Sequence, residues 1–286
     1  MTSLEEQYKK KGYVIIKNVF DGNEIDKIRS YIHKTFDLQN NSNLRMVYGS
    51  EIIKDQMLFS FFFRKKILNS LRILFGDDFE YIPDFIIQIN SFGQKEKKYK
   101  PGWHVDSASE GSAKYFLKKD YKFAKMGIYL QDNSKEYGGG INLTPGGHRI
   151  YLKFLPIRIV FFIKKLKDKL NIIFNNHFIK SKSGDIIIFD SRLPHASSLP
   201  KIDNQFIVQN KTEINKIDGL GNNSKFVFYC NVCSSKDSPD FMKHSSKRSL
   251  KEKSPFFDYS KQKYPDDYDK GFVKFIEDNK IKIAKI

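Results

Sequence analysis

Residues 184–190 read Gly-Asp-Ile-Ile-Ile-Phe-Asp, and this stretch decides the fold class. A turn-forming pair leads into a short apolar run rich in β-branched residues, which is typical of a buried strand (185–189). Similar apolar or alternating runs, each bounded by Gly, Pro, Asn or Ser, occur at 81–90, 125–132, 140–143 and 225–232. Several short strands with turn-rich joints predict an antiparallel barrel or sandwich.

The beginning of the chain predicts two helices around one more strand. Residues 4–11 form a short polar helix that Gly12 ends, and 13–19 is rich in β-forming residues. Asp21 or Asn23 can cap a following helix, because apolar residues then recur at helical spacing, at Ile25, Ile28, Tyr31 and Ile32. We therefore expect helices to flank the sheet.

Length and composition exclude several classes of protein. The 286 residues are 40% hydrophobic, enough to bury a sizeable core, so global disorder is excluded. The longest apolar stretch, 154–163, is interrupted by Pro156 and Arg158 and is too short to cross a bilayer. The first eleven residues do not resemble a secretory signal, and two cysteines, Cys230 and Cys233, make no disulfide framework. We expect a globular cytoplasmic protein with two ordinary thiols.

The chain carries a formal net charge of +17. A field of that sign attracts nucleic acid, anionic membrane surfaces or small anionic molecules. The lysines are scattered, however, and no run of six basic residues occurs, which favours the interpretation that they mainly keep the protein in solution.

Two segments stand apart from the strand pattern. Residues 151–180 are apolar and basic and predict an inserted helix. This helix could rest on a membrane surface or cover the mouth of the barrel, but packing on the barrel with a lysine-coated outer face is the preferred interpretation. We expect one domain over 1–233, with 234–286 as a C-terminal appendage that ends in a helix around 272–276.

One group of residues carries chemistry. Trp103-His104-Val105-Asp106 places two potential metal ligands two positions apart, and such residues project to the same face of a strand. His195 can complete the set from a neighbouring strand. Two imidazoles and one carboxylate with open positions suit non-haem Fe(II). His-x-Asp also occurs by chance in surface turns, so the motif alone is weak.

The surrounding pattern resembles a known family. Residues 138–149 form a glycine-rich turn, a short strand and a tight turn that ends in His148-Arg149, and 184–190 precede His195. Together with Trp-His-x-Asp, in this order, these stretches resemble the phytanoyl-CoA dioxygenase family of Fe(II)/2-oxoglutarate-dependent oxygenases. The resemblance spans about 4–232. It implies a double-stranded β-helix, or jelly-roll barrel, flanked by helices.

The resemblance implies that His104, Asp106 and His195 bind Fe(II), with 2-oxoglutarate and O2 as cosubstrates. Ser197 stands two residues after the distal histidine, as the family pattern expects. The far carboxylate of 2-oxoglutarate needs a buried cation, but the arginine that usually follows the distal histidine is missing.

Residues 200–223 look like an inserted loop, and we predict that Lys225, which follows it, takes the place of that arginine. An exposed lysine at a loop end is the equally weighted alternative, and Arg192 is the competing cation. Asn90 matches a position that touches the cosubstrate, although it could be a structural amide. Two further residues near the motifs are candidate substrate contacts, Trp103 and Arg149.

The leading hypothesis is a dioxygenase that hydroxylates a small, anionic organic substrate and releases succinate and CO2. The intact Asp106 favours hydroxylation, because related halogenases carry a small residue there. A nucleic-acid demethylating oxygenase is an alternative that only the positive charge supports. A non-catalytic jelly-roll binding protein is another, motivated by the missing arginine. The sequence does not specify an oligomeric state.

Overall fold

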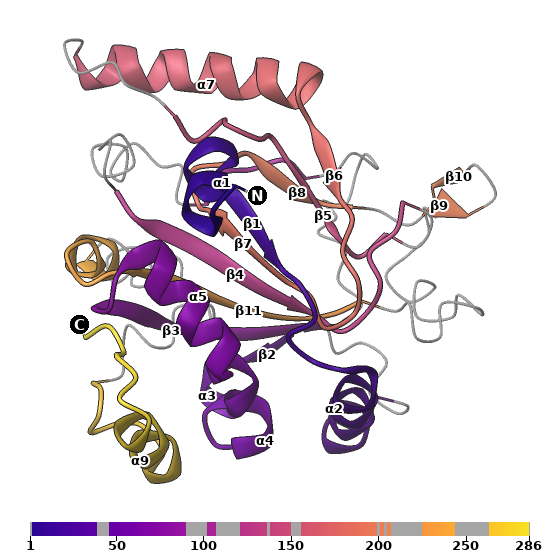
Figure 1. Cartoon of the computed structure of the whole chain (residues 1–286), viewed down its shortest axis with the longest axis vertical. Helices are drawn as coiled ribbons and strands as arrows, with labels where there is room; N and C mark the ends of the chain where they lie inside the picture. Colours follow the sequence, from indigo (N-terminus) through magenta and orange to yellow (C-terminus); the bar gives the residue numbers. More distant parts are fainter. Residues whose placement is uncertain are drawn as a thin grey trace.

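The fold is described from a computed structural model (Figure 1). It describes residues 2–38, 46–89, 102–106, 121–135, 138–149, 156–198, 201–202, 205–206, 225–243 and 263–285. The predicted cosubstrate residue Asn90 and most of the predicted inserted loop lie outside these ranges.

Two antiparallel sheets form the framework. The larger has six strands in the order β1-β7-β4-β11-β3-β2, and the smaller has three in the order β6-β5-β8. The larger sheet consists of β1 (Tyr13–Ile16), β7 (Ile186–Asp190), β4 (Phe123–Tyr129), β11 (Phe226–Ser234), β3 (Phe79–Ile89) and β2 (Met46–Tyr48). The smaller consists of β6 (His177–Ile179), β5 (Ile141–Leu143) and β8 (His195–Ser197), and a separate two-stranded pair is formed by β9 (Lys201–Ile202) and β10 (Gln205–Phe206).

The two sheets face each other across an apolar cluster. Side chains of alternate residues on β4, β7 and β11 meet those of β5 and β6, and this cluster comprises Tyr129, Ile141, Leu143, Ile179, Ile187, Phe189, Leu193, Val227 and Tyr229. The predicted mainly-β jelly-roll architecture is therefore confirmed, and each strand predicted from the sequence is present within a few residues of its expected ends.

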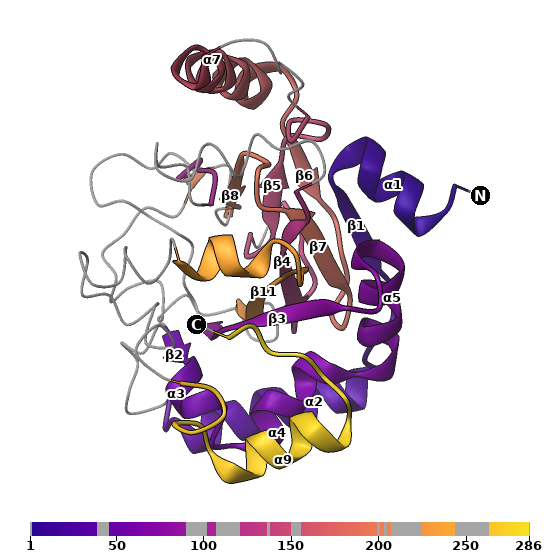
Figure 2. The same ribbon diagram turned by 90° about the vertical axis from the view of Figure 1, so that its left-hand side faces the viewer.

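Helices cover the other face of the larger sheet (Figure 2). They are α1 (Leu4–Lys11), α2 (Gly22–Thr35), α3 (Gly49–Ile52), α4 (Gln56–Phe59), the 3-10 helix η1 (Ser60–Phe63), α5 (Lys65–Phe75) and α9 (Lys270–Asp278). Both predicted N-terminal helices are present, and each begins with a capping box, at Ser3 and at Asp21. Their apolar faces join the outward residues of β4, β7 and β11 in the main core.

The turn before β7 holds the barrel to the N-terminal segment. Gly184 has φ +81°, and its backbone lies so close to Phe20 that an added Cβ would be 2.4 Å from the Phe20 carbonyl oxygen. Asp185 is fully buried, and its carboxylate accepts hydrogen bonds from Lys17 Nζ at 2.7 Å and the Asn18 backbone at 3.0 Å. The Gly-Asp pair is therefore needed for the joint between β7 and β1.

The chain after β11 packs against β3 and the helices. Ile283 forms a parallel bridge with Tyr81, and Phe272 of α9 is fully buried against Phe59 and Phe85. Residues 263–285 thus contribute side chains to the same core as the N-terminal helices.

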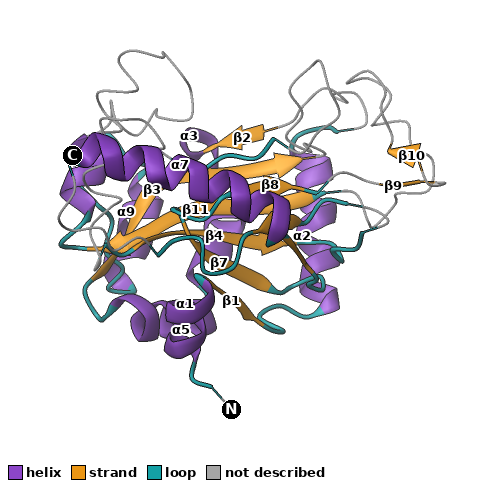
Figure 3. Ribbon diagram, turned by 90° about the horizontal axis from the view of Figure 1, so that it is seen from above, coloured by secondary structure: helices purple, strands orange, loops and turns teal. Residues whose placement is uncertain are grey.

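The predicted inserted helix is present as α7 (Ile157–Phe174), which lies across the smaller sheet (Figure 3). The expected lysine-coated outer face is present only in part, since Lys165 and Lys169 are exposed. Lys164 is buried, while large apolar side chains such as Phe162 and Leu166 are exposed. Among the described residues, no helix is long and apolar enough to traverse a bilayer.

Candidate metal centre

Three predicted ligands converge at the edge of the smaller sheet. His104 lies in the short described segment 102–106 and pairs with His195 of β8 through two backbone hydrogen bonds, of 3.0 and 2.9 Å. Oδ1 of Asp106 is 3.7 Å from Nε2 of each histidine. One donor atom from each residue lies within 4.8 Å of the others. The segment is an isolated bridge followed by a turn, so the expectation that His104 and Asp106 share one strand is wrong, although they do converge.

Backbone carbonyl groups set the orientation of both imidazoles. Nδ1 of His104 is 2.7 Å from the Gly102 oxygen, and Nδ1 of His195 is 3.0 Å from the Leu193 oxygen. A carbonyl oxygen can only accept, so each Nδ1 carries the proton and each Nε2 keeps its lone pair. Burial also lowers the pKa of His195 to about 4, which keeps this imidazole neutral and able to bind a metal.

A lysine opposite the triad holds Asp106 in its charged form. Lys125 of β4 forms an ion pair of 2.9 Å with the second carboxylate oxygen of Asp106. Burial alone would raise the pKa of the Asp106 carboxyl, but Lys125 and the two histidines reverse this effect and hold the pKa well below its usual range. The sequence analysis missed Lys125, although a lysine inside an otherwise apolar strand was a usable signal.

The inner face of the larger sheet forms the floor beside the triad. The hydroxyl groups of Tyr129 and Tyr229 lie 3.1 Å apart, and the Phe189 ring packs against His195 with centroids 4.9 Å apart. Gly127 makes room for these rings, because an added Cβ would lie 2.8 Å from the Tyr229 ring. This face beside the triad therefore presents aromatic rings and two tyrosine hydroxyl groups.

Lys225 lies just before β11 and is fully buried. Its ammonium group donates to Oγ of Ser197, two residues beyond His195, at 3.2 Å. Burial lowers its pKa to about 7, and in the described part of the chain no acidic group offsets this effect. A buried cation without an anion is costly unless an anion binds there. Lys225 is thus suited to receive an anionic group inside the barrel.

The competing cation, Arg192, is already engaged. It lies in the turn between β7 and β8 and donates to both carboxylate oxygens of Asp190, at 2.8 and 2.6 Å. Arg149 donates to the Lys10 carbonyl oxygen, and Trp103 is half-buried beside His104. The structure therefore brings Ser197 and Lys225 together, whereas Arg192 contacts Asp190 and Arg149 contacts the N-terminal helix.

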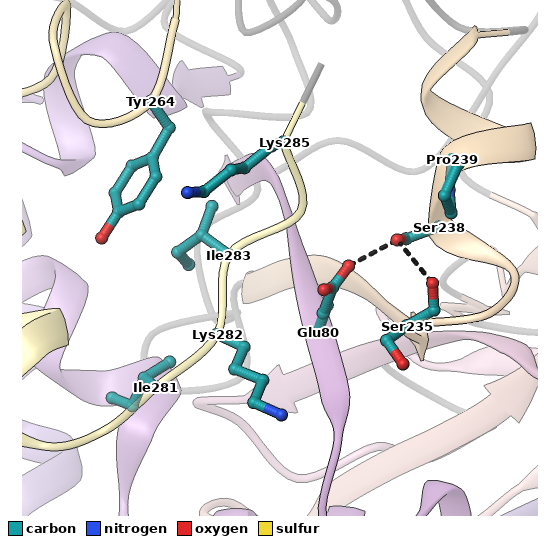
Figure 4. A pocket seen from close by; sticks show the side chains of 9 residues that line it. All are labelled: Glu80, Ser235, Ser238, Pro239, Tyr264, Ile281, Lys282, Ile283 and Lys285. Carbon is teal, nitrogen blue, oxygen red and sulfur yellow. Dashed lines mark hydrogen bonds between the residues drawn. The ribbon is translucent and has the colours of Figure 1, made fainter.

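A separate cavity of about 380 Å³ lies between β3, the residues after β11 and the C-terminal segment (Figure 4). Ser238 links Glu80 to the Ser235 carbonyl group at its edge. It contains none of the predicted ligands, and its lining comprises Glu80, Ser235, Ser238, Pro239, Tyr264, Ile281, Lys282, Ile283 and Lys285. The metal centre and this cavity are therefore formed by different parts of the chain.

The donor set itself identifies the ion that fits. Two neutral imidazoles and one ionised carboxylate on one side leave the remaining positions open, which is the arrangement that non-haem Fe(II) oxygenases use. In the described ranges, His104, Asp106 and His195 are the group of histidine, cysteine and acidic side chains that could hold a metal. Cys230 and Cys233 are buried in β11, and burial raises the pKa of both thiols well above the usual value.

Comparisons with known proteins agree with this fold. Among solved structures, the chain is similar to the non-heme alpha ketoglutarate dependent epimerase SnoN from nogalamycin biosynthesis, with TM-score 0.51 and 14% identity, over 81% of this chain and 80% of that one. It is also similar to EctD from S. alaskensis, solved with 2-oxoglutarate and 5-hydroxyectoine, with TM-score 0.53 and 16% identity, over 81% and 75% of the two chains. At these identities the likeness establishes the fold.

A search of curated proteins found no match. The sequence itself matches the family described as Phytanoyl-CoA dioxygenase (PhyH) over residues 8–199. Because this match covers more than half of the chain, and because the fold and the donor set agree with it, the protein belongs to the phytanoyl-CoA dioxygenase family of non-haem iron, 2-oxoglutarate-dependent oxygenases.

Proposed function

We propose that His104, Asp106 and His195 hold Fe(II), and that the protein hydroxylates a small, anionic organic substrate with release of succinate and CO2. The observation that carries the proposal is the convergence of two Nε2 atoms and one carboxylate oxygen within 4.8 Å. When bound, the iron supplies open coordination positions and the oxidising chemistry for O2 and 2-oxoglutarate.

The chain's own residues prepare this site for the metal. The Gly102 and Leu193 carbonyl groups fix the ring nitrogens that carry protons, and Lys125 keeps Asp106 ionised. The apolar cluster between the sheets and the Phe189 ring bury His195, while the His104 side chain is exposed to solvent.

The Lys225 ammonium and the Ser197 hydroxyl would bind the far carboxylate of 2-oxoglutarate. Two observations support this assignment. The Lys225 ammonium is buried, and it lies 3.2 Å from the hydroxyl of Ser197, which is on the same strand as the proposed metal ligand His195. Arg192 is the weaker candidate, because its guanidinium already makes two hydrogen bonds with Asp190. The 2-oxoglutarate in the EctD structure supports the same cosubstrate here at the level of the shared fold.

The charge of the protein supports an anionic substrate. A net charge of +17 raises the local concentration of small anions near the barrel. We expect phosphorylated acids or acyl-CoA thioesters to stimulate succinate release from 2-oxoglutarate more than their neutral analogues do. Equal stimulation by neutral analogues would show that the substrate is not recognised by its charge.

The central test is anaerobic addition of Fe(II) and 2-oxoglutarate, followed through the visible metal-to-ligand charge-transfer band. The wild type should form the band and His104→Ala should not, because one of the three ligands is lost. Lys225→Met should need at least tenfold more 2-oxoglutarate while binding Fe(II) normally. The exposed Lys180→Met serves as a matched control and should behave like the wild type.

The two parts of the proposal fail separately. A wild type that binds neither Fe(II) nor 2-oxoglutarate would refute the oxygenase assignment. Normal 2-oxoglutarate binding by Lys225→Met, combined with its loss in Arg192→Met, would show that Arg192 and not Lys225 binds the far carboxylate.

A further inference from the structure

Helix α7 contacts the rest of the protein partly through polar side chains. Lys164 is 6% exposed, pairs with Asp168 at 2.5 Å and donates to the Arg192 carbonyl oxygen at 3.4 Å. One turn further along, Lys167 donates to the Arg149 carbonyl oxygen. The side of the helix that faces the barrel therefore combines the buried Val160 with lysines that donate hydrogen bonds to backbone carbonyl groups of the barrel.

The opposite side of α7 is apolar and faces outward. We call it the outer stripe of α7. Its members recur three or four residues apart, which places them on one face of a helix. All are large and 46–68% exposed, and they are Ile159, Phe162, Leu166, Leu170 and Ile173. Figures 1 and 2 show the helix standing at the periphery, beyond the smaller sheet. An apolar face of this extent is typical of a binding surface.

The charges beside the outer stripe are all positive. Arg158, Lys165 and Lys169 are exposed on one flank of it. Asp168 is the single acidic residue of α7, and it faces inward to pair with Lys164. A face that combines large apolar side chains with lysine and arginine fits the boundary between lipid headgroups and acyl chains. Phosphate groups of anionic lipids would then meet the three cations.

We propose that the outer stripe of α7 and its basic flank bind the surface of an anionic lipid bilayer. A second copy of the chain is a poorer occupant, because two molecules of charge +17 repel each other and their basic flanks would approach. An anionic bilayer presents both an apolar phase for the stripe and negative charge for the flank. The proposal is independent of the reaction proposed above.

Binding at α7 would bring the bilayer close to the metal-bearing part of the barrel. The Arg192 carbonyl group that Lys164 contacts lies three residues before His195. The helix therefore docks on the loop that leads into β8, and a bound bilayer would lie on the side of the molecule that carries the smaller sheet (Figure 3).

The test is co-sedimentation of the full chain with vesicles of phosphatidylcholine alone or with about a third phosphatidylglycerol. The wild type should bind the phosphatidylglycerol vesicles at least tenfold more strongly. Phe162→Gln with Leu166→Gln should reduce that binding more than tenfold, because two exposed apolar side chains no longer enter the bilayer. Lys165→Gln with Lys169→Gln should weaken binding to these vesicles at least tenfold, because each cation near the bilayer surface contributes to the affinity.

Matched controls come from helices on the other side of the molecule. Ile73 of α5 is 57% exposed, and Lys27 and Lys34 of α2 are exposed, so Ile73→Gln and Lys27→Gln with Lys34→Gln should leave vesicle binding within twofold of the wild type. Far-UV circular dichroism and the iron-dependent visible band establish that each variant is folded.

Three outcomes would overturn the proposal. One is a wild type that binds neither kind of vesicle. Another is vesicle binding that the α7 and control variants reduce equally. The third is a dimer in sedimentation velocity that dissociates in Phe162→Gln with Leu166→Gln, without vesicle binding by the wild type, which would assign the stripe to a second copy.

Discussion

Lys225 carries a buried charge that no acidic group among the described residues offsets. In an unfolded chain a lysine has a pKa of about 10.4, whereas burial lowers the pKa of Lys225 to about 7. The unfolded state therefore binds this proton more tightly. The stability cost of this buried charge is therefore complete below about pH 7, and it disappears as the pH rises from about 7 to about 10.4.

Lys225→Met should therefore stabilise the protein in the absence of 2-oxoglutarate. We expect its free energy of unfolding at pH 7 to exceed that of the wild type by about 1–3 kcal/mol, with the difference shrinking at pH 9.5. Urea denaturation at the two pH values measures it. Lys225→Arg is the control that stays charged, and it should give no such gain. A less stable Lys225→Met at both pH values would contradict the burial of an uncompensated ammonium.

The ion pair between Lys125 and Asp106 orients a proposed metal ligand through the carboxylate oxygen that lies away from the two histidines. Removing a hydrogen-bonded partner of a ligand typically lowers metal affinity 10- to 100-fold. We expect Lys125→Met to weaken Fe(II) binding by about that factor at fixed pH, and Lys125→Arg to restore part of it. Anaerobic titration with Fe(II) measures the affinity. An unchanged affinity in Lys125→Met would show that the pair is structural only.

At the scale of single elements, the joint between the N-terminal segment and β7 depends on one backbone conformation. Gly184→Ala would add a Cβ 2.4 Å from the Phe20 carbonyl oxygen, at a residue whose φ is +81°. Because both the left-handed conformation and the contact are unfavourable for alanine, we expect a loss of about 2–3 kcal/mol in stability. Gly22→Ala, where a Cβ has open space, is the control in the same urea experiment. Equal stability of the two variants would contradict this reading.

Helix α7 shows that a local sequence pattern can predict a helix without predicting which of its side chains face the barrel. The apolar and basic character of 151–180 correctly predicted a helix, and its lysines suggested a solvated outer face. Lys165 and Lys169 are exposed as expected, but Lys164 turns inward, where it pairs with Asp168 of the same helix and donates to the Arg192 carbonyl oxygen. Periodicity shows that a helix has two unlike faces, but which one contacts the protein depends on the groups that the barrel offers.

At the scale of the whole molecule, residues from both ends of the chain share one core. Phe272 is fully buried against Phe59, Phe85 and Tyr268. Phe272→Ala should lower the free energy of unfolding by about 3–5 kcal/mol. The unfolding transition should remain single and cooperative, as measured by circular dichroism and fluorescence together. Val273→Ala, at a half-buried neighbour, should have a smaller effect. Separate transitions in the variant would indicate that the C-terminal segment folds as an independent unit.

The residue types and spacings of this chain determined where most strands lie and which side chains can bind a metal. Alternation and apolar runs are local properties, and they predicted β1, β4, β7 and β11. The order of the His-x-Asp, Gly-Asp and His-x-Ser stretches carried the resemblance to the family. Short elements with few residues, such as β2 and β6, gave too weak a periodic signal to be predicted.

Only the tertiary structure decided the partners of the charged groups. Lys125 meets Asp106, Arg192 turns to Asp190, and Lys225 enters the barrel beside Ser197. These pairings depend on which strands face each other across the barrel and on how deeply each charged group is buried. Neither can be read from residues that are neighbours in the sequence. The sequence therefore indicated the candidate ligands, whereas packing across two sheets determined the environment around them.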